Sequence, residues 1–125
     1  MPATVFVISP LHDERKWIEA TLAPAVGAVV FVDDGAALLA RLPATSPTCL
    51  VTAAEPDAGA ALQLVRDLRG QGVMLPVIVL GPHSAFRVAV DIARFPATDF
   101  LERPVSARQL RLAVGKALRG IGTHK

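Results

Sequence analysis

Short apolar runs alternate with longer amphipathic stretches along the 125-residue chain. The runs are rich in apolar and β-branched residues and carry few polar positions, which indicates strands that are buried on both faces of a sheet. Strands with one face in water would instead alternate apolar and polar residues. The predicted strands are Val5–Ile8, Val29–Val32, Cys49–Ala53, Val77–Leu80 and Thr98–Leu101.

The stretches between the predicted strands have the apolar spacing of helices. In HDERKWIEATL, residues Trp17, Ile18 and Leu22 fall on one side of a helix. Acidic residues occupy its first turn, where the helix dipole stabilises them, and Pro24 follows its end. The other predicted helices are Gly35–Leu42, Asp57–Arg69, Ser84–Arg94 and Ser106–Leu118.

This order of elements predicts an α/β fold, namely a doubly wound, five-stranded parallel sheet with helices on both faces. The length suits one domain, which we place at residues 1–120, with a flexible C-terminal tail at residues 121–125. Ligands of doubly wound folds bind at the carboxyl ends of the strands. The residues that follow each predicted strand are therefore the first candidates for a functional site.

Composition narrows the class of protein. A hydrophobic content of 52% with 19% charged residues is unlike that of disordered chains. The net charge of +2 comes from scattered Lys and Arg residues, so nucleic-acid binding by this chain alone is not expected. No apolar run approaches the roughly 18 residues of a membrane span, and the N-terminus is not a signal peptide. The single cysteine, Cys49, fits a cytoplasmic protein without an internal disulfide.

One stretch points to a family. VIVLGPHSAFRVAVDIARFPATDFLERP, which runs from Val77 to Pro104, resembles the fourth to fifth strands of receiver domains in two-component response regulators, the CheY-like family. The ending DFLERP is its most specific part, and the element order agrees from Val5 to about Leu118. The resemblance implies a CheY-like, flavodoxin-like (βα)5 fold with strand order 2-1-3-4-5. It also implies a module of phosphorelay signal transduction rather than an enzyme.

The phosphorylation pocket of that family needs five groups at the strand ends. An acidic pair after the first strand holds Mg²⁺, which prefers oxygen ligands, and an aspartate after the third strand accepts the phosphoryl group. A hydroxyl after the fourth strand and a lysine after the fifth respond to the phosphoryl group. In this sequence the five positions fall on Ser9, Pro10, Ala53, Gly81 and Arg103, and the family's switch aromatic falls on Phe100.

Four of the five groups are therefore absent and one is altered. If the acceptor position is instead counted back from Pro56, it falls on Thr52, which is not a carboxylate either. Arginine keeps a positive charge, but its planar fork does not replace lysine conservatively. The resemblance thus predicts a degenerate receiver, or pseudo-receiver, without phosphotransfer chemistry.

Other acidic residues could replace the missing carboxylates of the pocket, but the sequence gives them only weak support. Asp33 and Asp34 end the second predicted strand, not the first, and we predict that one of them caps the next helix. Glu55 and Asp57 lie near the mouth of the pocket and could in principle accept a phosphoryl group, although a helix cap is the favoured role of Asp57.

The remaining polar residues suggest no metal or cofactor site. The three histidines, His12, His83 and His124, have no spacing typical of metal ligands, and we expect them at the surface. No glycine-rich phosphate-binding run is present. We therefore expect no metal and no cofactor.

The sequence supports two main functional interpretations. The favoured one is a phosphorylation-independent protein-protein interaction module. The alternative is a sensor that binds a small anion in the strand-end crevice lined by Ser9, Ala53, Gly81 and Arg103. In either case we expect the Arg103 guanidinium to pair with a carboxylate or an anion. A regulatory fragment at the N-terminus of a DNA-binding response regulator is a further possibility.

The interaction module would use the surface through which receivers usually dimerise or bind targets, formed by the fourth helix, fifth strand and fifth helix. In the fifth helix an apolar residue, Leu112, falls among cations on the arc opposite to the core. We predict that this face binds a protein partner or forms a homodimer, with Leu112 at its centre. The predicted face comprises Arg87, Asp91, Arg94, Arg108, Arg111, Leu112, Lys116 and Arg119.

Overall fold

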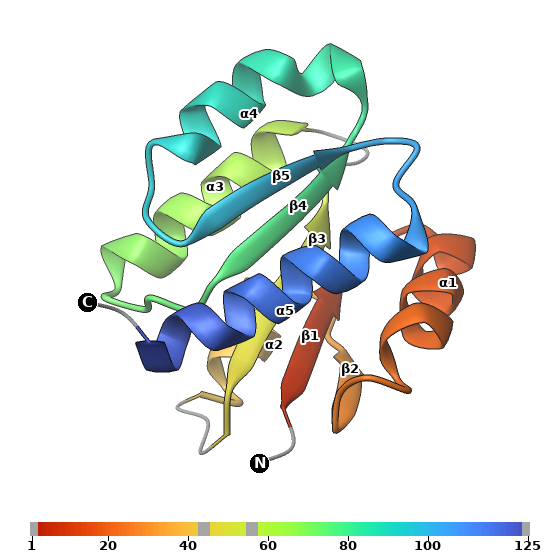
Figure 1. Cartoon of the computed structure of the whole chain (residues 1–125). Helices are drawn as coiled ribbons and strands as arrows, with labels where there is room; N and C mark the ends of the chain where they lie inside the picture. The colour runs from red at the N-terminus through yellow and green to blue at the C-terminus, as the bar shows by residue number, and fades with distance from the viewer. Residues whose placement is uncertain (1–2, 43–45, 55–57, 124–125) are drawn as a thin grey trace.

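A computed structural model of the chain describes residues 3–42, 46–54 and 58–123, and the side chains as far as residue 119. Strands and helices alternate throughout, as the sequence predicts (Figure 1). In chain order the elements are β1 (Thr4–Ile8), α1 (His12–Leu22), β2 (Ala28–Phe31), α2 (Gly35–Leu39), β3 (Thr48–Ala53), α3 (Ala58–Gly70), β4 (Val77–Gly81), a short 3-10 helix η1 (His83–Ala85), α4 (Phe86–Ala93), β5 (Thr98–Glu102) and α5 (Ala107–Thr123).

The five strands form one parallel sheet in the order β2-β1-β3-β4-β5, which confirms the predicted fold. The register places the carboxyl ends of neighbouring strands side by side. Ile8 of β1 pairs with Thr52 of β3, and Gly81 of β4 pairs with Glu102 of β5. The residues that follow these strands therefore meet at one edge of the sheet.

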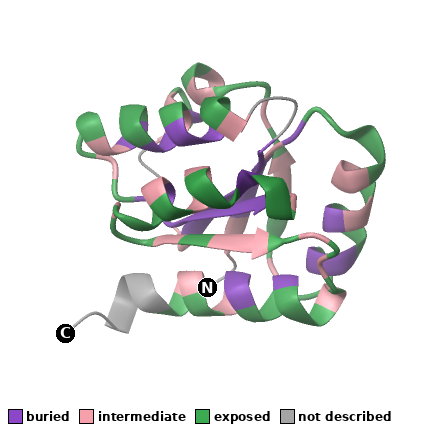
Figure 2. Cartoon of the chain, turned by 90° about the horizontal axis from the view of Figure 1, so that it is seen from above, coloured by how far each residue is buried: buried purple, intermediate pink, exposed green. Residues whose placement is uncertain are grey.

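Helices cover both faces of the sheet. Helices α1 and α5 lie on one face and α2, α3 and α4 on the other (Figure 1). Alternate residues of each central strand enter opposite cores: on β4, Val77 and Val79 join the α3 side, whereas Ile78 and Leu80 join the α5 side. Figure 2 shows the buried residues on the inward sides of the helices and along the middle of the sheet. Two-sided burial explains why the central strands are almost wholly apolar.

Several boundaries differ from the predicted ones. Strand β2 begins and ends one residue earlier than predicted, and it is not buried on both faces, because it lies at the sheet edge. Helix α2 ends at Leu39 rather than at Leu42. Helix α5 continues to Thr123, so residues 121–123 of the predicted tail are helical, while residues 124–125 lie outside the described part of the chain. None of the described helices has both the length and the apolar character that a bilayer crossing requires.

A half-buried arginine that the sequence analysis did not single out, Arg69, holds the turn before β5. The Arg69 guanidinium donates hydrogen bonds to the carbonyl oxygens of Val73 at 2.8 Å, Pro96 at 2.9 Å and Ala97 at 3.3 Å. Ala97 has a φ of 57°, in the left-handed region that non-glycine residues adopt only when their surroundings hold them there. Burial lowers the pKa of Arg69. This residue therefore ties the end of α3 to the start of β5.

Candidate functional site

The strand-end crevice is organised around an ion pair between segments far apart in the sequence. Arg103, just after β5, donates from Nε to Oε2 of Glu14 at 2.8 Å and from Nη2 to Oε1 at 2.9 Å. Glu14 belongs to the first turn of α1. The side chains of Arg103 and Glu14 are only 24% and 13% exposed. The two-bond geometry is the strong form of an arginine-carboxylate pair, and it confirms that Arg103 pairs with a carboxylate.

Ser9 completes this cluster beside β1. Its hydroxyl donates to Glu14 Oε1 at 3.4 Å and accepts a hydrogen bond from the Leu11 amide at 3.2 Å. Ser9 is 8% exposed, whereas Pro10 is exposed. The structure thus brings Ser9 and Arg103 together through Glu14, which the sequence analysis assigned no role. An acid in a first helical turn has an ordinary explanation in the helix dipole, so the sequence carried no separate signal for Glu14.

Among the described residues, the end of β3 offers no carboxylate that could accept a phosphoryl group. Thr52 is 3% exposed, and its hydroxyl donates to the backbone oxygen of Ile8 at 2.9 Å. Ala53, at the other alignment of the acceptor position, is 6% exposed and has no polar group on its side chain. Cys49 lies further back in the same strand, where burial raises the pKa of its thiol from 9.0 to about 12. A neutral, buried thiol is a poor nucleophile.

At the end of β4, an aromatic ring fills the space that a side chain would need. A Cβ atom on Gly81 would lie 2.7 Å from Cζ of Phe100 and 2.9 Å from Cβ of Ala54. Phe100 is partly buried and packs against the core on the α3 side of the sheet. Position 81 therefore lacks a hydroxyl, and the ring of Phe100 and the methyl group of Ala54 occupy the volume beside it.

The acidic residues outside this crevice have other roles. Asp34 caps α2, because its Oδ1 accepts from the Ala37 amide at 2.8 Å, as predicted for one of the two aspartates. Glu55 and Asp57 lie outside the described residues. Within the described part of the chain, no group of three or more His, Cys, Asp or Glu side chains is placed to hold a metal ion.

Most side chains of the predicted interaction face are exposed. Leu112 is 58% exposed on α5, and the arginines and the lysine assigned to the face are also exposed, while Asp91 is half-buried. Arg94 lies one residue beyond the end of α4. The structure adds two apolar residues that the sequence analysis missed, Phe86 at 53% and Val90 at 54% exposure, one turn apart on α4. Their exposure depends on the rotation of α4, which the pattern of residues alone did not determine.

Comparisons with known proteins support the receiver fold that the sequence predicts. No family model matches the sequence. The transcriptional regulatory protein FixJ of Bradyrhizobium diazoefficiens is 26% identical over 115 residues, which cover 92% of this chain and 56% of FixJ. The DNA-binding transcriptional regulator NtrC of Escherichia coli is 27% identical over 114 residues, which cover 91% of this chain and 24% of NtrC. The chain thus spans about half or less of the length of these relatives.

The solved structures are similar over nearly the whole chain. The crystal structure of FixJ-N matches with a TM-score of 0.81 and 25% identity, covering 95% of each chain. Full-length FixJ from B. japonicum matches with the same TM-score of 0.81 and 26% identity, over 94% of this chain and 58% of FixJ. The sheet order, the helix arrangement and these similarities define a receiver domain. This chain is a receiver domain of the response regulators of two-component signalling.

Proposed function

We propose that this receiver domain signals without being phosphorylated, as a pseudo-receiver that acts through protein-protein contacts. The observation that carries the proposal is the strand-end crevice, where the described residues at the Mg²⁺, acceptor and hydroxyl positions have no carboxylate or hydroxyl free to act. Ser9 binds Glu14 and Leu11, and Ala53 and Gly81 have no functional group.

The Glu14–Arg103 pair is a further argument against a phosphoryl group in this crevice. Mg²⁺ needs several oxygen ligands in octahedral geometry. Both carboxylate oxygens of Glu14 already accept from the Arg103 guanidinium. A magnesium ion would have to break this pair, and within the described residues no group of three or more His, Cys, Asp or Glu side chains is placed to hold it. The contacts favour a crevice held closed by the chain itself.

We propose that the signal leaves through the face formed by α4, β5 and α5. The exposed apolar side chains of Phe86, Val90 and Leu112 supply surface that gains free energy on burial, and the arginines around them supply register and specificity. Aromatic residues and arginine are enriched at the cores of protein interfaces, and α4 carries Phe86 next to Arg87. The partner is either a second copy of this chain or another signalling protein.

Light scattering on Leu112→Asp tests this proposal. The substitution places a charge at the centre of the face without touching either core, so circular dichroism should remain unchanged. Self-association, or capture of a purified partner, should fall at least tenfold. Leu11→Asp is a matched control, because Leu11 is 39% exposed and precedes α1, outside α4, β5 and α5. If Leu112→Asp behaves like the parent in both assays, the interaction surface lies elsewhere.

The structure and the comparisons bear differently on the two alternative functions, an anion sensor and a regulatory domain of a longer DNA-binding protein. An anion sensor at Arg103 loses support, because Glu14 occupies two donors of the guanidinium. A regulatory domain within a longer DNA-binding regulator gains support, since the relatives are named as transcriptional regulators and this chain spans only 56% of FixJ. That arrangement is compatible with phosphorylation-independent contacts.

A cytoplasmic location is also part of the proposal, because it fits a domain whose single cysteine is a free thiol.

A further inference from the structure

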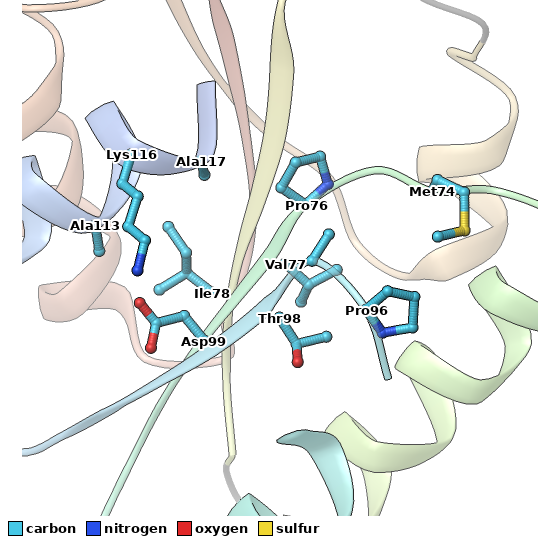
Figure 3. Close-up of a pocket in the computed structure, with 11 residues that line it drawn as sticks. Met74, Pro76, Val77, Ile78, Pro96, Thr98, Asp99, Ala113, Lys116 and Ala117 are labelled. Atoms are coloured by element: carbon cyan, nitrogen blue, oxygen red, sulfur yellow. The ribbon is translucent and has the colours of Figure 1, made fainter. Parts of the chain in front are cut away.

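A hollow of about 660 Å³ lies at the end of the sheet opposite to the strand-end crevice. It opens between α5 and the amino-terminal parts of β4 and β5 (Figure 3). Small-molecule sites in proteins commonly have volumes of about 300–1,000 Å³, so the hollow has the size of a ligand site. Pro76 and Ile78 line it from the sheet side, and Ala113 and Ala117 line it from α5.

The hollow exists because α5 presents small residues where it crosses this part of the sheet. Ala113 and Ala117 are one helical turn apart, and each has only a methyl group to place against the sheet. The larger residues Leu110 and Val114 of the same helix pack into the core and are 0% and 2% exposed. Ile78 lies beneath the hollow at 1% exposure, and the accessible apolar lining comes from Met74, Pro96 and Ala117. The hollow therefore offers an apolar surface to a ligand.

Two residues of opposite charge, Lys116 and Asp99, line the same side of the hollow. Lys116 projects from α5 and Asp99 from β5, and their charged ends point toward one another in Figure 3. The Asp99 carboxylate accepts a hydrogen bond from the Phe100 amide at 2.9 Å. Among the described residues, no ion pair within 4.0 Å joins Lys116 to Asp99. Both groups are exposed and keep hydrogen-bonding capacity for a ligand.

We propose that this hollow binds a small zwitterion with a bulky apolar body, such as a free aromatic or branched amino acid. The ligand carboxylate would meet Lys116 and the ligand ammonium would meet Asp99. The apolar side chain of the ligand would pack on the accessible apolar lining, which is Met74, Pro96 and Ala117. A simple anion would be repelled by Asp99 and a simple cation by Lys116. Charge complementarity thus favours a molecule that carries both charges over a molecule that carries either one.

The site is separate from the strand-end crevice, but it shares Lys116 with the predicted interaction face, so a bound ligand would lie beside that face. Asp99 and the residues of β4 that line the hollow lie at the amino ends of their strands, whereas Arg103 and Gly81 lie at the carboxyl ends. Ligands of doubly wound sheets are usually found at the carboxyl ends. Binding here would give a receiver domain a chemical input that does not pass through the inherited pocket.

Amide NMR titration with three matched compounds tests the proposal on the whole chain. L-phenylalanine carries both charges, hydrocinnamate lacks the ammonium, and phenethylamine lacks the carboxylate. We expect saturable shifts centred on Ile78, Asp99 and Ala117 with phenylalanine, and at least fivefold weaker binding of the two analogues. No saturable shift, or equal binding of all three compounds, would overturn the proposal.

Substitutions separate this site from other surfaces. Lys116→Gln and Asp99→Asn should each weaken phenylalanine binding at least fivefold, and Ala117→Leu should abolish it by filling the hollow. Lys16→Gln is the matched control, because Lys16 is an exposed lysine on α1 that does not line the hollow. If Lys116→Gln binds phenylalanine as the parent does while Lys16→Gln weakens binding, the ligand occupies another site and the proposal is wrong.

Discussion

Arg103 illustrates how one residue changes what a strand end can do. A lysine at this position would present a single flexible ammonium, whereas the arginine fork matches both oxygens of one carboxylate. Glu14, 89 residues away in the chain, provides that carboxylate. The sequence predicted the lost pocket groups, because each follows a recognisable strand. It did not predict the new partner, because a contact across so many residues leaves no local pattern.

Removing the Glu14 carboxylate should destabilise the domain. In Glu14→Gln the Arg103 guanidinium keeps its place in a crevice where it is 24% exposed, but it loses its charged partner. Because the pair is partly exposed, we expect the free energy of unfolding to fall by about 1–2 kcal/mol, measured by urea denaturation. Glu19→Gln, an exposed position on the same helix, should change it by less than about 0.5 kcal/mol. Equal effects of the two substitutions would contradict a specific role for the pair.

The ring of Phe100 occupies the space beside position 81, so a side chain added there should destabilise the domain. Gly81→Thr places a Cβ atom 2.7 Å from the ring of Phe100, so we expect a loss of about 1–3 kcal/mol in the free energy of unfolding. Gly70→Ala is the control, because its added Cβ meets nothing within 4 Å.

A double-mutant cycle measures the contact itself. Phe100→Ala alone should destabilise the domain, but Gly81→Thr should cost less in the Phe100→Ala background than in the parent. If the two substitutions are additive, the ring does not limit the space at position 81.

At the scale of elements, the central strands were the most predictable. Strand β4 differs from the prediction by one residue, because a two-sided apolar run has few alternatives. The edges were less predictable: β2 is shifted by one residue and half-exposed, since its position at the sheet edge depends on the order of all five strands. The turn before β5 was also missed, because Arg69 stabilises it from α3 through contacts that no local pattern indicates.

Arg69 should couple α3 to β5 more strongly than its place in an ordinary amphipathic helix suggests. Arg69→Ala removes donors to three carbonyl oxygens, those of Val73, Pro96 and Ala97, so we expect the free energy of unfolding to fall by about 2 kcal/mol. Arg69→Lys should recover little of this loss, because one ammonium cannot match the fork geometry. Arg66→Ala, at an exposed position one turn earlier, is the control. Full recovery by lysine would indicate that charge alone holds the turn.

At the scale of the whole molecule, the fold does not depend on the pocket chemistry. Both cores consist of residues that lie away from the positions where the family places its acidic pair and its lysine. The receiver architecture can therefore persist while the strand-end groups change. What the architecture keeps is a face of α4, β5 and α5 with exposed apolar and cationic side chains, which is the part that a protein partner would contact.

The most direct test of phosphorylation-independent signalling is intact-mass spectrometry after incubation with acetyl phosphate and Mg²⁺. A receiver domain with a complete aspartate pocket, treated in parallel, verifies that the donor is active. Because Ala53 and Thr52 offer no carboxylate and Arg103 is paired with Glu14, we predict no gain of mass in this chain. A stoichiometric gain of one phosphoryl group would contradict the central claim, and its loss in Asp57→Asn would identify the residue that accepts it.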